Sequence, residues 1–177
     1  MNAGDGQASL SHVGGPQHGL IKGNGWQPMQ MNHILVPVDG SQAALKAVDL
    51  ASNLAGKFEA RLTLLHVVED IAMSEDLKRF AELEHLPDEP EKMHMEVIAK
   101  AILDEARRQA ATLGVAQPQT EVRQGNPAME ILDYAEGNDV DTIVIGNEGL
   151  GRIEGWLLGS VSQKVNYLST CTCITVK

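Results

Sequence analysis

The chain has 177 residues, which is enough for one ordinary domain with a short appendage. Hydrophobic residues make up 43% and charged residues 21%, the balance of a globular protein, and no apolar run approaches the length of a membrane span. The net charge of -10 argues against a nucleic-acid partner, because phosphate binding depends largely on Lys and Arg.

The first 31 residues differ from the rest of the chain. They are rich in Gly, Gln, Ser and Asn, and their only charged side chains are Asp5 and Lys22. They lack the basic start and apolar core of a secretory signal. Because such a segment buries too little apolar surface to offset its ordering entropy, we expect residues 1–31 to be a disordered extension and residues 32–177 to be the domain. Only two cysteines are present, which is no disulfide framework and favours a cytoplasmic protein.

Strand and helix patterns alternate along the domain. The pattern predicts strands at 33–38, 61–68, 120–124, 141–146 and 172–176. It predicts a first helix over 43–55 that ends at Gly56, a short helix over 74–85, and a long helix whose buried stripe runs from Met95 through Ile98 to Ala110. A fourth helix starts at Asn126 and Pro127 with Met129 on its buried stripe, and a last helix covers 160–168.

This alternation predicts a doubly wound α/β domain, with helices on both faces of a five-stranded parallel sheet in the order 3-2-1-4-5. Ligands of such sheets bind outside the carboxyl ends of the strands, where the strand order reverses. The strands that end in "VDGS" and "IGNEG" carry the most unusual sequence at that edge. We therefore expect the site there.

The stretch "GNEGLGRIEGWLLGS", residues 146–160, combines regular glycine spacing with a helix start. A bare Gly146 keeps the strand tip clear, and Gly149 is expected to take a positive φ and turn N–H groups inward as an anion nest. Gly159 opens the last helix, where free N–H groups and the Ser160 and Ser162 hydroxyls favour a phosphate. The residues alone leave two interpretations open, an anion site and an ordinary glycine turn.

Taken with the rest of the chain, this stretch resembles the nucleotide-binding signature of the universal stress protein family, which is Gly, two residues, Gly, nine residues, Gly, then Ser or Thr. The resemblance spans residues 31–177 and includes "ILVPVDGS", "LLHVV", "GNP", "DTIVIG" and "LLGSVSQKV". It implies an adenine-nucleotide alpha-hydrolase-like fold. It also implies a site for ATP, ADP or AMP, with or without Mg²⁺, made by Pro37, Val38, Asp39, Val67, Ile145, Gly146, Gly149, Gly159, Ser160, Val161 and Ser162.

The chain departs from the family inside the loop itself. Asn147 and Glu148 stand where members often have Ser followed by Arg or His, and Leu150 replaces another common basic residue. Arg152 is then the only nearby cation. A carboxylate close to a triphosphate is unfavourable, so AMP, ADP or Mg²⁺-bridged ATP is easier to accommodate than free ATP.

The resemblance further implies a homodimer, because members typically pair their final edge strands across a two-fold axis. The pairing residues here are Cys173, Ile174, Thr175 and Val176. No catalytic residue and no metal site is assigned, since Ser160 has no partner His in the predicted fold and the Cys171–Cys173 pair lacks a second pair. The favoured function is a non-enzymatic, nucleotide-binding stress or regulatory protein. A dimeric interaction module without nucleotide and a slow ATPase are the alternatives.

Overall fold

The computed structural model describes residues 31–69, 89–149 and 159–177. The predicted helix at 74–85 and nearly all of the predicted extension lie outside the described residues. Met31, assigned to the extension from the sequence, is only 8% exposed and packs in the core. The elements in chain order are β1 (His33–Pro37), α1 (Gln42–Phe58), β2 (Arg61–Val68), α3 (Glu89–Thr112), β3 (Gln119–Gln124), α4 (Pro127–Gly137), β4 (Thr142–Gly146), α5 (Ser160–Leu168) and β5 (Thr172–Val176).

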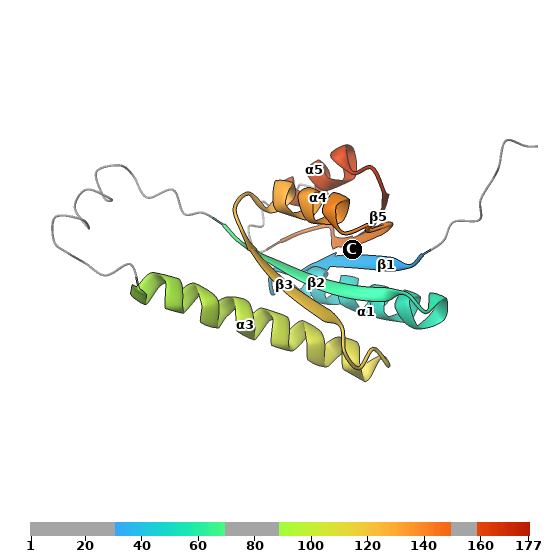
Figure 1. Cartoon of the computed structure of the whole chain (residues 1–177), viewed down its shortest axis with the longest axis horizontal. Helices are drawn as coiled ribbons and strands as arrows, with labels where there is room; N and C mark the ends of the chain where they lie inside the picture. The colour runs from blue at the N-terminus through green and yellow to red at the C-terminus, as the bar shows by residue number, and fades with distance from the viewer. Residues whose placement is uncertain (1–30, 70–88, 150–158) are drawn as a thin grey trace, which may run out of the picture.

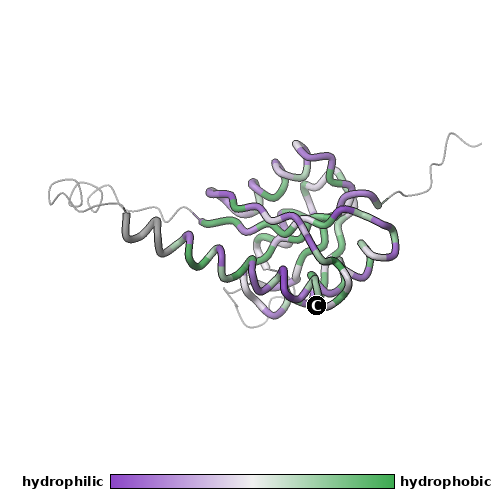
Figure 2. Tube along the Cα trace, turned by 60° about the horizontal axis from the view of Figure 1, so that its bottom comes forward, coloured by the Kyte–Doolittle hydropathy of each residue, from purple (hydrophilic) through white to green (hydrophobic). Residues whose placement is uncertain are grey.

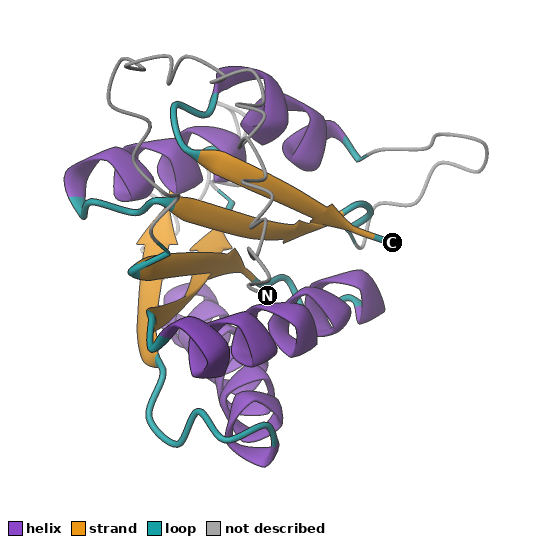
Figure 3. Cartoon of the chain, turned by 90° about the vertical axis from the view of Figure 1, so that its right-hand side faces the viewer, coloured by secondary structure: helices purple, strands orange, loops and turns teal. Residues whose placement is uncertain are grey.

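The five strands form one parallel sheet in the order β3-β2-β1-β4-β5, which confirms the predicted topology. Helices α1 and α3 cover one face of this sheet, and α4 and α5 cover the other (Figures 1 and 3). The chain moves from β1 to β2 on one side and from β4 to β5 on the other. The strand order therefore reverses between β1 and β4, at the centre of the sheet.

Each face of the sheet has its own apolar core, because successive strand residues point to opposite faces. Ile34 and Val36 pack under the alanine-rich stripe of α1, whereas Leu35 packs under α4 and α5. In Figure 2 the central strands are almost uniformly hydrophobic and the helices carry alternating colours. This is the pattern expected of strands buried on both faces.

Two residues predicted on buried stripes are exposed instead. Ile98 is 45% exposed and lies in the amino-terminal half of α3, which extends beyond the sheet (Figure 1). Met129 is 48% exposed in the first turn of α4. Both residues lie in helices, as the periodicity predicted. Their side chains are exposed because the helices face the sheet with other residues.

The carboxyl end of α1 also differs from the prediction. The helix continues past Gly56 to Phe58, and the left-handed residue that ends it is Glu59, with φ of 56°. The Ala55 carbonyl accepts hydrogen bonds from the N–H groups of both Glu59 and Ala60. This arrangement satisfies the last helical carbonyls without glycine, so the rule that glycine marks a helix end was wrong here.

Candidate functional site at the carboxyl ends of β1 and β4

The reversal of strand order places two loops side by side, one after β1 and one after β4. Because α1 and α5 follow these strands on opposite faces of the sheet, both helices begin at this edge. Neither helix has an acidic residue in its first turn. Helix N-termini carry free N–H groups and partial positive charge, so this edge of the sheet favours an anion.

The turn after β1 is fixed by its own polar groups. Val38 donates its N–H to Leu65 O at 2.8 Å and accepts at its carbonyl from His66 Nδ1 at 2.8 Å. Asp39 Oδ1 accepts from the Ser41 N–H at 2.9 Å, and the Ser41 hydroxyl caps α1 by accepting from the Ala44 N–H at 3.1 Å. Gly40 has a φ of 84°, a conformation that favours glycine.

Four residues predicted from the resemblance, at or near the carboxyl ends of β1, β2 and β4, differ in how exposed they are. Pro37 and Val67 are half-buried at the carboxyl ends of β1 and β2. The main-chain groups of Val38 are already bonded within the protein, and its side chain is only 4% exposed and belongs to the core under α1. Ile145 is only 5% exposed and belongs to the core under α4 and α5.

Gly146 has a packing role within the protein. A Cβ at this position would lie 2.8 Å from the Ala43 carbonyl carbon and 2.9 Å from the Ala44 nitrogen. The strand tip is therefore kept bare for the first turn of α1, which passes directly against it. The absence of a side chain serves helix packing here.

The predicted conformation of Gly149 is wrong. Its φ lies outside the left-handed region, which among described glycines is adopted by Gly40, Gly114 and Gly125. A Cβ on Gly149 would instead lie 2.7 Å from Asp39 Oδ2. A side chain at this position would have to displace the Asp39 carboxylate of the neighbouring loop.

The donors predicted at the start of α5 fall into two groups, those already bonded within the protein and those exposed. Gly159 is the N-cap, has no side chain to cap the helix, and donates its N–H to Asn147 O at 2.6 Å. The Ser162 hydroxyl is buried and lies 3.1 Å from Asn147 O and 2.9 Å from Gly159 O. Ser160 is exposed, and Val161 is half-buried. The free N–H groups of the first turn remain, as at any helix start.

Asn147 has a structural role that the sequence did not predict. Its N–H donates to Val176 O at 2.7 Å, so the pairing of β4 with β5 extends one residue past Gly146. Its carbonyl accepts from the start of α5, and the carbonyl of the next residue, Glu148, accepts from the Ser41 hydroxyl at 3.4 Å. Residues 147–149, the described part of the loop after β4, are thus attached to β5, α5 and the turn after β1.

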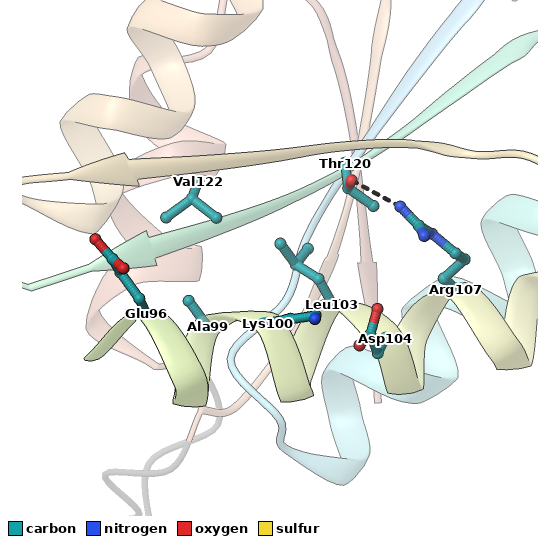
Figure 4. A pocket seen from close by; sticks show the side chains of 8 residues that line it. All are labelled: Glu96, Ala99, Lys100, Leu103, Asp104, Arg107, Thr120 and Val122. Carbon is teal, nitrogen blue, oxygen red and sulfur yellow. Dashed lines mark hydrogen bonds between the residues drawn. The ribbon is translucent and has the colours of Figure 1, made fainter. Parts of the chain in front are cut away.

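A groove of about 450 Å³ lies elsewhere, between α3 and β3 (Figure 4). Its floor is apolar, and Arg107 closes one end by donating to Thr120 Oγ1 at 3.1 Å. The rim mixes both charges, with Glu96, Lys100, Asp104 and Arg107. This groove is separate from the loops after β1 and β4.

Metal and membrane features can be stated for the described residues. Within residues 31–69, 89–149 and 159–177, no group of three or more His, Cys, Asp or Glu side chains is arranged to hold a metal ion. No helix in these ranges is long and apolar enough to cross a membrane. Cys171 and Cys173 are free thiols, and burial together with the neighbouring Cys171 raises the pKa of Cys173 to about 11.

Comparisons with known proteins agree with this architecture. The family model described as the universal stress protein family matches residues 31–177. The universal stress protein YxiE of Bacillus subtilis is 38% identical over 148 residues, which cover 82% of this chain and 99% of that protein. The solved universal stress protein UspA of Lactobacillus plantarum is 30% identical with a TM-score of 0.70, covering 84% of this chain and 99% of its own.

A further solved relative is a universal stress protein in complex with cAMP, which is 26% identical with a TM-score of 0.59 and covers 83% of this chain and 97% of its own. The family match, the identity to YxiE and the shared sheet order agree over nearly the whole described domain. The chain belongs to the universal stress protein family.

Proposed function

We propose that this universal stress protein binds an adenine nucleotide at the carboxyl edge of the sheet, beside the loops after β1 and β4, with a phosphate at the start of α5. The observation that carries the proposal is the segment 147–149 after β4, which is bonded to β5 and α5 and lies between the Asp39 turn and a helix start whose cap residue, Gly159, has no side chain. Helix N–H groups and the helix dipole stabilise a phosphate at such a position. The relative solved with cAMP supports the same ligand class.

Within this site, the predicted contacts take distinct roles. Asp39 is suited to accept from a ribose hydroxyl or the base, because a carboxylate accepts only. Pro37 and Val67, both half-buried, offer apolar surface at the strand ends, where a base would stack, and the buried Val38 supports them from the core. Ser160, exposed in the first turn of α5, is the hydroxyl best placed to donate to phosphate.

The charge of the site favours a short phosphate chain. Asp39 and Glu148 lie on the two loops that border it, and each carboxylate opposes a second or third phosphate. We propose AMP or ADP as the preferred ligands, with ATP bound as its Mg²⁺ complex because the cation offsets part of the charge.

The proposed assembly is a homodimer through β5. In the part of the chain that the structure describes, β5 pairs with β4 alone, and all of its residues are partly exposed. An edge strand with open N–H and C=O groups is a ready pairing surface for a second copy. The pairing segment is Cys173, Ile174, Thr175 and Val176.

Native mass spectrometry and isothermal titration calorimetry test the nucleotide proposal. The purified full chain should retain or take up one adenine nucleotide per subunit, with AMP and ADP binding more tightly than Mg²⁺-free ATP. Ser160→Ala should weaken AMP binding several-fold, since one neutral hydrogen bond contributes about 0.5–1.5 kcal/mol. Thr170→Ala removes an exposed hydroxyl just before β5, away from the site; it is the matched control and should leave affinity unchanged.

A second candidate function is a dimeric interaction module that binds no nucleotide. The observation favouring it is that two predicted donors, the Gly159 N–H and the Ser162 hydroxyl, are already bonded within the protein. A dimer by analytical ultracentrifugation, together with no heat and no thermal shift for any adenine nucleotide, would select this module and reject the nucleotide site.

A further inference from the structure

Two serines two residues apart in the first turn of α5 have different surroundings. Ser160 is exposed, whereas Ser162 is only 3% exposed and its hydroxyl lies against two carbonyl oxygens. A serine hydroxyl has one proton to donate, and carbonyl oxygens can only accept. The Ser162 proton is therefore directed at the protein's own main chain.

Phosphate oxygens of a bound nucleotide are also acceptors, so a hydroxyl that binds them must donate. Ser162 could do so only by giving up its bonds to Asn147 O at 3.1 Å and Gly159 O at 2.9 Å, and by leaving a buried position. Leaving a buried carbonyl with fewer donors is unfavourable. Ser162 is thus poorly suited to be a phosphate ligand.

The Asn147 peptide is where this hydroxyl acts. Its carbonyl accepts from Gly159 N–H at 2.6 Å as well as from Ser162, and its N–H donates to Val176 O at 2.7 Å. Residues 147–149 are consequently attached to the start of α5 by the Gly159 bond and by the Ser162 hydroxyl, whose one proton is shared between Asn147 O and Gly159 O, and to the end of β5 by the Val176 bond. These bonds fix the direction in which the first-turn N–H groups of α5 point.

We infer that Ser162 is a positioning residue of the proposed nucleotide site, which holds the loop after β4 on the start of α5 through the Asn147 carbonyl and leaves Ser160 as the hydroxyl for the phosphate. The inference rests on the proposed function for its ligand, whereas the attachment is a contact within the protein itself. Removing the Ser162 hydroxyl should loosen the loop before any nucleotide is added.

The test compares Ser162→Ala, Ser162→Thr and Ser160→Ala, with AMP and adenosine as probes. In nucleotide-free protein, hydrogen exchange at the Gly159 amide should be several-fold faster in Ser162→Ala, should return to the wild-type rate in Ser162→Thr, and should be unchanged in Ser160→Ala. Ser162→Ala should weaken AMP binding about threefold to tenfold and leave adenosine binding unchanged.

Unchanged Gly159 exchange in Ser162→Ala would overturn the inference, and weakened AMP binding with unchanged exchange would identify Ser162 as a direct ligand instead. A measurement on the wild type avoids dependence on variant folding. The Ser162 hydroxyl proton should exchange slowly enough to be seen by NMR and should keep its chemical shift when AMP is added; a large shift would contradict the positioning role. If wild-type protein binds no nucleotide, the proposed function fails while the exchange data still decide the attachment.

Discussion

The edge of the sheet where the strands begin and the edge where they end are held together by different kinds of group. At the amino end, side chains connect three neighbouring strands: His33 Nε2 lies 2.8 Å from Thr63 Oγ1, and Thr63 Oγ1 donates to Gln119 Oε1 at 3.3 Å. Arg61 Nη2 lies 2.7 Å from His33 Nδ1, and Asp141 Oδ2 accepts from the His33 N–H at 3.2 Å. The polar side chains at this end of the sheet thus bond to one another and to the main chain.

At the carboxyl end, the connections run mainly through the main chain. The Asn147 peptide bonds to Val176 and Gly159, and Gly146 and Gly149 allow α1 and Asp39 to come close. The first-turn N–H groups of a helix need acceptors from outside the helix. The protein supplies only some of these acceptors, so some N–H donors stay available at this end. The carboxyl edge, where we propose that the nucleotide binds, is therefore built mainly from small residues and backbone, whereas the opposite edge is connected by long polar side chains.

Placing a side chain at Gly146 is expected to have the largest effect. Gly146→Ala puts a Cβ within 3 Å of two backbone atoms of α1, and backbone cannot move aside as a flexible side chain does. We expect a loss of about 2–3 kcal/mol in the free energy of unfolding, measured by urea denaturation. The matched control is Gly56→Ala, a helical glycine with nothing within 4 Å, which should gain about 0.5–1 kcal/mol. Equal effects of the two variants would show that α1 does not pack on the tip of β4.

Lowering the pH should reduce the free energy of unfolding through His33, at the edge of the sheet where the strands begin. Burial lowers the pKa of His33 below its usual value, and the Arg61 guanidinium lowers it further, against the opposing effects of the Asn138 carbonyl, Asp141 and Asp139. Because the folded pKa is the lower one, the unfolded chain binds more protons below about pH 6.5. Stability is then complete above that pH and falls as the pH drops through the folded pKa, by about 1.4 kcal/mol for each unit of pKa difference.

Urea denaturation of the wild type and His33→Gln between pH 5 and pH 8 measures this contribution. The difference between the two proteins isolates His33 from the carboxylates, which titrate in both. The wild type should lose more stability than His33→Gln between pH 7 and pH 5. Parallel curves would mean that His33 is not held neutral in the folded protein.

The contact between Gly149 and Asp39 predicts a coupled pair at the carboxyl end. Gly149→Ala alone should reduce AMP affinity about tenfold and lower stability by about 1 kcal/mol, because its Cβ meets Asp39 Oδ2 at 2.7 Å. In an Asp39→Ala background the same change should have little effect on stability, since the carboxylate is gone. A double-mutant cycle in urea should give a coupling of about 1 kcal/mol. If the two losses of stability are additive, the Asp39 carboxylate is not the reason for glycine at position 149, and backbone conformation is the remaining explanation.

Much of the fold was predictable because it depends on local periodicity. The bounds of β2, α5 and β5 and the strand order follow from apolar spacing and from the rules for parallel sheets, and the structure confirms them. The end of α1 was not predictable from Gly56, because the bonds of Ala55 decide it.

The details of the site were less predictable because they depend on contacts between distant segments. Gly146 is required by α1 and Gly149 by Asp39, and neither neighbour is visible from the glycine spacing. One signal was available at Ser162, which lies three residues before the fully buried Val165 and so shares its inward helix face. That spacing separates Ser162 from the exposed Ser160.

The smallest expected difference lies between two helix caps at the carboxyl end. Ser41 accepts from the Ala44 N–H at 3.1 Å and Asn126 Oδ1 accepts from the Met129 N–H at 3.3 Å, so each →Ala variant should lose about 1 kcal/mol of stability. Ser41 Oγ also donates to Glu148 O at 3.4 Å, a long bond to the loop after β4, and Asn126 lies at the start of α4 instead. Ser41→Ala should therefore weaken AMP binding about twofold to threefold in calorimetry, while Asn126→Ala leaves it unchanged. Equal AMP affinities for the two variants would mean that the bond to Glu148 does not help to hold the loop, and that Asn147 and Gly149 fix it without Ser41.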